Sequence, residues 1–277
     1  MNYAYSVVIS IALILGMNQQ VFGTHAMGLD LTYERVGADS FLVTLAFYRD
    51  CAGVNAANSY NINVRSASCG YNFNESLPRV GAAQETTPVC ASLTTECSGG
   101  SFPGSEEYVY QKIVVLPAQC TDWIMSNRIC CRNNGITTIN NPGSESIYVE
   151  TTIDNTIINN SPVFSNNPVP FVCSDQLYCF NNGAVDPDGD SLAYSLVTPR
   201  TNTGAGDTVT FNAGFTKTSP ITSNPALSID SSTGDICMFP TDSTEIGVMA
   251  ILVDEYRNGL LTNTDDVKHQ LLINILM

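Results

Sequence analysis

Three carboxylates at alternate positions are the residues of this 277-residue chain best suited to chemistry. Asp186, Asp188 and Asp190 are separated by Pro187 and Gly189, which bend the backbone so that the carboxylate oxygens can converge on one point. Converging carboxylates are what a hard cation such as Ca²⁺ requires. The alternative is a solvated turn in which the Asp side chains accept hydrogen bonds from nearby backbone N–H groups. The residues alone leave both interpretations open.

An EF-hand loop does not fit this segment. With Asp186 as the first loop position, the required glycine would fall at Ser191 and the bidentate glutamate at Val197. The acidic residues are followed instead by the strand-like run 192–196. We therefore expect the three aspartates at a turn that leads into a strand.

Alternation of apolar and polar residues dominates the rest of the chain. It predicts strands in the first part at 29–36, 41–50, 60–66, 107–116, 121–129 and 146–154, with a loop over 81–106. It predicts strands in the second part at 177–183, 192–199, 207–215, 227–240, 246–256 and 267–277. Short strands at regular spacing indicate an all-β, disulfide-rich fold of two immunoglobulin-like β-sandwich domains in tandem.

The domain organisation begins with a predicted signal peptide at 1–23. Residues 7–17 form an apolar block too short to cross a bilayer, and polar residues and Gly23 follow it. Because no Lys or Arg precedes the block, an uncleaved anchor is the alternative. We place an N-terminal Cys-rich β-sandwich domain at 24–158 and a second β-sandwich domain at 159–277. The mature chain is expected to be secreted or at the cell surface, exported past the inner membrane and not inserted in a membrane.

Ten cysteines in an exported chain predict a disulfide framework. They are Cys51, Cys69, Cys90, Cys97, Cys120, Cys130, Cys131, Cys173, Cys179 and Cys237. Seven precede the domain boundary and three follow it, so either one bridge crosses the boundary or two thiols stay free. We expect a crossing bridge, because free thiols would be oxidised outside the cell. We favour Cys179 with Cys237 and Cys173 tied to the first domain, although sequence does not fix connectivity. Zinc is not favoured, because the chain has two histidines, His25 and His269, and no CxxC spacing.

The formal charge of −15 argues against nucleic acid and anionic membranes as partners. Catalysis is not predicted either, because the chain has no GxSxG motif. The adjacent pairs Glu106–Glu107 and Asp254–Glu255 would point to opposite faces of a strand and could not flank one bond. Trp123 is either a platform for carbohydrate stacking or a side chain packed on a disulfide.

The second half resembles the cadherin-like and bacterial putative-Ig repeats of surface proteins. The matching segments are SPVF at 161–164, DPDGDSLAYSL at 186–196, LSIDSSTGDI at 227–236 and ILVDEYRNG at 251–259. The resemblance implies that Asp186 and Asp188 join a Ca²⁺ site near a domain junction, and we take Asp190 and Asp254 as further candidate ligands. The family's LDRE stretch and acidic linker motif are missing here, which favours one ion over three.

The first half resembles the N-terminal region of large exported Bacteroidota proteins that carry gliding-motility or type IX secretion domains. The matching segments are 24–37, 45–54, 102–123 and 129–139. Both resemblances imply a non-catalytic surface protein, possible calcium stiffening, and other surface proteins or extracellular glycans as partners. We expect a role in adhesion or in the structure of a surface assembly. A glycan-binding module is the alternative, and it would require an exposed aromatic cluster.

Overall fold

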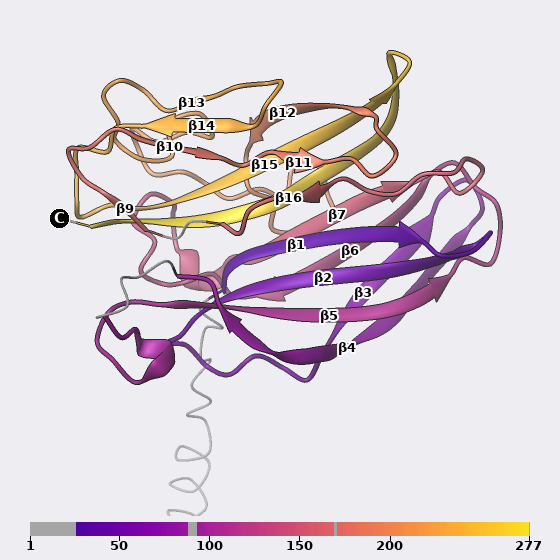
Figure 1. Ribbon diagram of the computed structural model, residues 1–277, viewed down its shortest axis with the longest axis horizontal. Helices are drawn as coiled ribbons and strands as arrows, with labels where there is room; N and C mark the ends of the chain where they lie inside the picture. The colour runs from indigo at the N-terminus through magenta and orange to yellow at the C-terminus, as the bar shows by residue number, and fades with distance from the viewer. Residues whose placement is uncertain (1–25, 88–92, 169–170, 277) are drawn as a thin grey trace, which may run out of the picture.

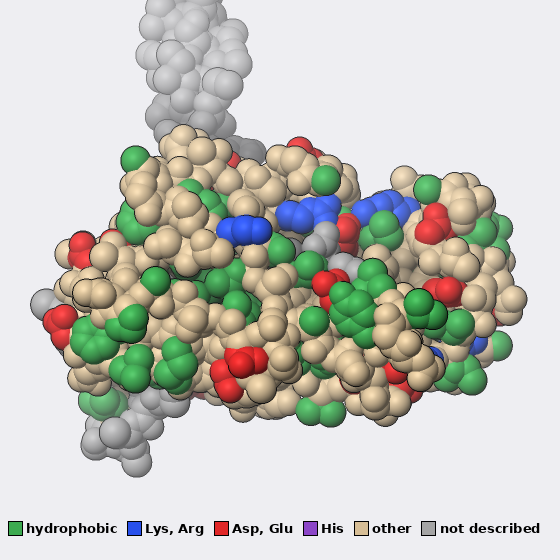
Figure 2. Space-filling model, turned by 90° about the horizontal axis from the view of Figure 1, so that it is seen from above, with side chains coloured by type: hydrophobic (Ala, Val, Ile, Leu, Met, Phe, Trp, Pro, Cys, Tyr) green, Lys and Arg blue, Asp and Glu red, His purple; other side chains and the backbone are tan. Residues whose placement is uncertain are grey.

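The computed structural model describes residues 26–87, 93–168 and 171–276, with side chains described as far as Asn263. The predicted signal peptide, His25 and Cys90 lie outside the described residues, as does the side chain of His269. The described chain is all-β apart from two three-residue 3-10 segments, η1 (Glu96–Ser98) and η2 (Pro142–Ser144). Charged side chains are sparse on the face seen in Figure 2, where hydrophobic side chains gather in patches among backbone and other uncharged side chains.

Strands from the first half form one seven-stranded antiparallel sheet in the order β1-β2-β5-β4-β3-β6-β7. They are β1 (Ala26–Arg35), β2 (Ser40–Asp50), β3 (Ser59–Ser66), β4 (Tyr71–Glu85), β5 (Ser105–Val115), β6 (Trp123–Cys130) and β7 (Ser146–Ile153). Strand β4 pairs with β3 through residues 71–78 and with β5 through residues 79–85, with a register shift after Val80. The sheet therefore folds over on itself, and a hydrophobic core that includes Phe41, Tyr110 and Trp123 fills the space between its two parts.

Strands from the second half form three smaller sheets. The four-stranded sheet has the order β12-β15-β16-β9, the three-stranded sheet β10-β14-β13, and β11 pairs with β8. These strands are β8 (Val163–Phe164), β9 (Phe171–Cys173), β10 (Tyr178–Asn181), β11 (Ala184–Val185), β12 (Ser191–Val197), β13 (Ser228–Ile229), β14 (Asp235–Met238), β15 (Ile246–Arg257) and β16 (Leu260–Leu276). Inward residues such as Tyr194, Ile236 and Ile251 form a second core between the larger two sheets. The predicted all-β, immunoglobulin-like architecture of two sandwiches in tandem is confirmed.

The two halves share an extensive contact. Strand β16 lies against β1 and β7, which are the two edge strands of the seven-stranded sheet (Figure 1). As a result β1 and β7 are buried on both faces along most of their length, which is unusual for edge strands. A third hydrophobic cluster, with Met27, Ile139 and Val248 among its members, joins segments from both halves. The two edge strands of this sheet, which could have paired with another chain, are thus covered by a strand of the same chain.

Two details of the predicted strands are wrong. The predicted loop over 81–106 begins inside β4, a fifteen-residue strand whose exposed residues and Pro78 obscure its alternation. The predicted strand at 207–215 is irregular and makes isolated bridges at Thr208 and Phe211. Its apolar residues are nevertheless buried or partly buried, because Val209 and Phe211 pack in the cluster between the halves. The alternation of apolar and polar residues in this segment therefore arises because its apolar side chains pack against the first half. It does not indicate a strand of a sheet.

Candidate metal centre

The turn after β11 combines both interpretations of the Asp cluster. One carboxylate oxygen of Asp186, Oδ1, accepts hydrogen bonds from the backbone N–H groups of Asp188 at 2.9 Å and Asp190 at 3.0 Å. Gly189 has φ of 82°, a conformation that glycine adopts without steric cost. The other oxygen of Asp186, Oδ2, is buried and has no hydrogen-bond partner among the described residues. Half of this carboxylate therefore shapes the turn, and half remains available for a cation.

A glutamate from the facing strand completes the acidic cluster. Asp186, Asp190 and Glu255 each offer a carboxylate oxygen, and these oxygens lie within 4.8 Å of one another. Glu255 is on β15 and is fully buried, in line with the inward residues Ile251 and Val253. We call Asp186, Asp188, Asp190, Glu255 and Arg257 the acidic junction.

Two of the predicted ligands do not belong to this group of converging carboxylates. Asp254 lies outside this group, because side chains alternate along β15 and the inward position belongs to Glu255. Asp188 turns toward the linker, where it accepts hydrogen bonds from the backbone N–H of Asn160 at 2.6 Å and its side-chain Nδ2 at 3.0 Å. Asp186 and Asp190 are thus the two predicted residues that the structure brings together.

Arg257 partly neutralises the acidic junction. Its Nε lies 2.9 Å from both carboxylate oxygens of Asp190, its Nη2 lies 2.5 Å from Oδ2, and Asp188 is 3.8 Å away. Hydrogen bonding to Arg257 holds the pKa of the Asp190 carboxyl below its ordinary value, and the same contact raises the pKa of Arg257. Four carboxylates against one guanidinium leave a surplus of three negative charges if all are ionised.

The acidic junction also joins the two halves through the linker. Arg257 donates to the carbonyl of Ile158 at 2.9 Å and to Oδ1 of Asn159 at 2.6 Å, and Asn159 donates to Glu255 at 3.1 Å. The next linker residues reach β1, where Ser161 Oγ accepts from the backbone N–H of Tyr33 at 2.8 Å. A change in the charge of this cluster would therefore be transmitted to the contact between the halves.

The chemistry of the donor set suits calcium. Ca²⁺ takes carboxylate and carbonyl oxygens in flexible geometry, and Asp186, Asp190 and Glu255 offer three carboxylates from two separate elements. The buried Oδ2 of Asp186, which has no hydrogen-bond partner among the described residues, is the observation that fits a calcium ligand. Sequence reasoning missed Glu255 as a ligand, although alternation would have selected it over Asp254.

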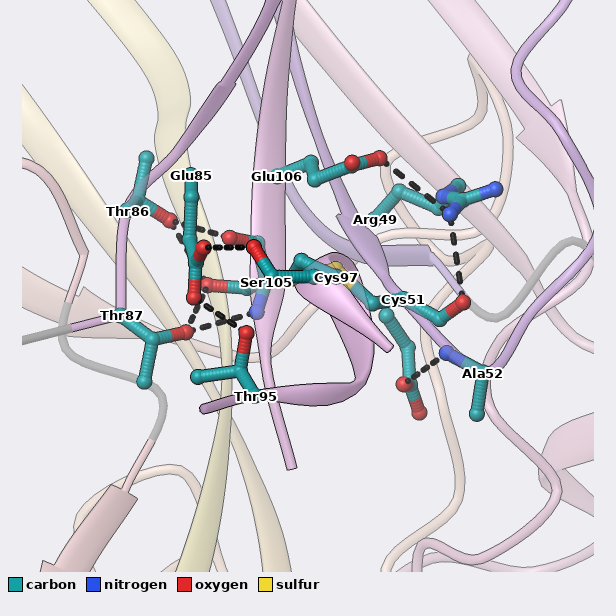
Figure 3. The surroundings of a disulfide bond; sticks show 12 residues. Arg49, Cys51, Ala52, Glu85, Thr86, Thr87, Thr95, Cys97, Ser105 and Glu106 are labelled. Atoms are coloured by element: carbon teal, nitrogen blue, oxygen red, sulfur yellow. Dashed lines mark hydrogen bonds and ion pairs between the residues drawn. A yellow bond between two sulfur atoms is a disulfide. The ribbon is translucent and has the colours of Figure 1, made fainter. Parts of the chain in front are cut away.

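A second group of possible metal ligands contains two cysteines that are joined in a disulfide bond. Cys51 and Cys97 lie near Glu106, but their sulfurs are joined in a disulfide, so neither offers a thiolate (Figure 3). Glu106 forms an ion pair with Arg49 at 3.2 Å across the β2–β5 pairing. Asp50, the acidic neighbour of Arg49 in sequence, instead accepts a hydrogen bond from the next turn. This region serves to tie the η1 loop to the end of β2.

Three further disulfides occur among the described residues. The predicted Cys179–Cys237 bridge is present and links facing positions of β10 and β14. The remaining pairs are Cys69–Cys120 and Cys130–Cys131. Cys173 is exposed and has no disulfide partner in the described part of the chain. Its tie to the first domain stays a prediction, since Cys90 lies outside the described residues.

A second junction between the halves is rich in arginine. Glu150 on β7 forms ion pairs with Arg65 at 2.9 Å and with Arg200 of the second half at 2.6 Å. Arg128 and Arg132 donate at 3.0 Å to the carbonyls of Thr201 and Arg200. Burial opposes ionisation of Glu150, but the hydrogen bond from Tyr148 and both arginines lower its pKa below the ordinary value. We call Glu150 and these four arginines the arginine junction.

The aromatic residues do not form the exposed cluster that glycan binding would require. Trp123 is fully buried, and it stacks on Tyr71 with ring centroids 5.5 Å apart and meets Phe73 edge-on. Tyr71 is the aromatic residue with substantial exposure in the described chain, at 38%. Trp123 is therefore a core residue, and its packing argues against a carbohydrate platform at this position.

Comparisons with known proteins leave the family open. No family model matches the chain, and no curated protein matches it. One solved structure, titin Ig tandem domains A164-A165, is similar over 91% of this chain and 98% of its own length, with 8% sequence identity and a TM-score of 0.20. No membrane-length apolar helix occurs within the residues that the structure describes.

Proposed function

We propose that this chain is a secreted, non-catalytic protein of the cell surface that acts in adhesion or as a structural part of a surface assembly. Four disulfides in the described residues support an oxidising, extracellular setting. The resemblance of the first half to Bacteroidota surface proteins supports export. The covered edges of the seven-stranded sheet support a stiff contact between the two halves.

Calcium at the acidic junction is the second part of the proposal. The observation that carries it is the approach of the Asp186, Asp190 and Glu255 carboxylates to within 4.8 Å in a cluster with surplus negative charge. The ion would relieve this repulsion and fix the linker against β1 and β15. Its role would be to stiffen the contact between the halves, and no reaction is required of it.

A thermal melt of the oxidised mature protein in excess Ca²⁺ and in chelator tests the calcium site. A ligand that binds the folded state alone stabilises it by about 2.7 kcal/mol when its free concentration is 100 times Kd. We expect a higher Tm in Ca²⁺ than in chelator for the native protein. The double variant Asp186→Asn with Glu255→Gln should lose this difference, because two ligands lose their charge while the shape is kept.

Asp254→Asn is the matched control, since Asp254 neighbours Glu255 on β15 but lies outside the ligand group. It should keep the full Ca²⁺ response. The same Tm in Ca²⁺ and chelator for the native protein would overturn the calcium site. A response lost equally in Asp254→Asn would show that the effect is non-specific electrostatics.

A further inference from the structure

A pocket of about 160 Å³ lies between the outer face of the β1–β2–β5 region and the chain around β8. Its wall from the sheet follows from strand register, because Asp30 faces Ala46, which faces Val109, and Tyr48 faces Glu107. These residues alternate with Leu29, Leu31 and other core residues, so they point away from the first core. Phe164 closes the opposite side. The pocket shares no residue with the acidic junction.

One end of the pocket carries two carboxylates that share a phenol. Tyr48 Oη lies 3.2 Å from Asp30 Oδ2 and 3.2 Å from Glu107 Oε1. A phenol has one hydrogen, so it donates to one of these oxygens at a time. Asp30 and Tyr48 are 7% and 5% exposed, so solvent screens this end weakly. Burial, opposed by the Tyr48 hydrogen bond and reinforced by the charge of Asp30, raises the pKa of Glu107.

The rest of the lining is mixed. It has an apolar part, formed by Ala46, Val109, Val163 and Phe164, and a polar part, formed by Thr32, Thr44, Asn166 and Asn167. A negative end and an aliphatic wall suit a ligand that has a cationic head on a hydrocarbon stem. The volume exceeds what one metal ion would fill. The net charge of −15 would also attract a basic partner over long range.

We infer that this pocket binds a primary ammonium group, as carried by a lysine side chain of a basic partner protein. The ammonium group would lie against Asp30 and Glu107, and the methylene groups would pack along Ala46 and Val109. The inference rests on the proposed surface role in that it names the chemistry of the partner. It does not require calcium.

A peptide titration in chelator tests the pocket separately from the calcium site. The probes are acetyl-Gly-Gly-Lys-Gly-Gly-amide and the same peptide with norleucine in place of lysine, and binding to the full mature protein is followed by calorimetry. We expect the lysine peptide to bind and the norleucine peptide not to bind. Glu107→Gln should weaken the lysine peptide at least tenfold. Glu34→Gln, an exposed position on β1 outside the pocket, should leave it unchanged.

Ala46→Leu provides a second variant, which fills the pocket without touching a charge and should also weaken binding tenfold or more. No binding of the lysine peptide to the native protein would overturn the inference. Equal binding of the norleucine peptide, or unchanged binding to both pocket variants, would do the same. Binding of methyl mannoside in place of the peptide would overturn it in favour of a glycan site. A failed calcium melt leaves these outcomes unaffected.

Discussion

The acidic junction and the arginine junction join the same two halves with opposite balances of charge. At the acidic junction four carboxylates face one guanidinium, whereas the arginine junction has four arginines, of which Arg65 and Arg200 form ion pairs with Glu150. Glu145 also acts on the charge of Arg132. The arginine junction satisfies its charges with protein groups, because Arg128 and Arg132 donate to backbone carbonyls. Ionised carboxylates accept hydrogen bonds instead, and Asp186 and Asp188 accept them from backbone N–H groups. The backbone therefore satisfies part of the excess charge at each junction, but Oδ2 of Asp186 is buried without such a bond and is left for a cation.

The two junctions also differ in exposure. The side chains of Glu150 and Arg200 are 10% and 9% exposed, whereas that of Arg257 is 33% exposed. Burial makes a pair costly to break, since the remaining charge stays in a weakly screened site. At the acidic junction the carboxylates of Asp190 and Glu255 are buried as well, and it is their cationic partner, Arg257, that remains exposed to solvent. This difference indicates a permanent lock at one junction and, at the other, carboxylates whose exposed arginine partner can be supplemented by an ion.

The largest effect is expected from Glu150→Gln. The change leaves Arg65 and Arg200 without their carboxylate, and breaking a buried pair in this way costs about 3–5 kcal/mol. We expect the free energy of unfolding in urea to fall by that amount. Arg128→Gln is the control at the same junction, and its loss of one contact to Thr201 should cost less than about 1 kcal/mol, because Arg128 is exposed. Equal effects of both variants would contradict the idea of a buried lock.

A smaller effect, with a distinct dependence on calcium, is expected from Arg257→Gln. Removal of the guanidinium raises the negative surplus at the acidic junction, and we expect a loss of about 1–2 kcal/mol in chelator after allowance for its exposure. Calcium should restore part of this loss, so the Ca²⁺-induced rise in Tm should be larger than in the native protein. The same Tm rise in both proteins would show that Arg257 and calcium do not serve the same carboxylates.

Sequence patterns predicted the turn of the acidic junction better than they predicted which residues form the rest of it. The Asp-Pro-Asp-Gly-Asp run fixes a local turn, and strand alternation after it is confirmed in β12. The same alternation distinguishes Glu255 from Asp254, provided that Ile251 and Val253 are taken as inward residues. Asp254 and Glu255 are neighbours on β15 and point to opposite faces, so one cation cannot use both carboxylates.

The remaining members of the junctions depend on contacts between distant segments. Arg257 is separated from Asp190 by 67 residues and from Asn159 by 98 residues along the chain. No local sequence pattern identifies such a partner, since an arginine near the end of a strand could equally well extend into solvent. Strand β4 escaped prediction for a related reason, because its pairing with both β3 and β5 is set by the folding of the whole sheet. Local periodicity therefore predicts elements, whereas the junctions follow from the way those elements pack.

The smallest effect separates the junctions by their response to acid. Glu150 and Asp190 both have a pKa lowered in the folded state, so each contributes stability above its unfolded pKa of about 4 that is lost as the pH falls through the folded value. Unfolding in urea at pH 6, 4.5 and 3 measures this loss. Because Glu150 has two arginine partners and deeper burial, Glu150→Gln should flatten the acid-induced loss more than Asp190→Asn. A greater flattening in Asp190→Asn would place the stronger charge coupling at the acidic junction and would reverse the assignment of lock and ligand site.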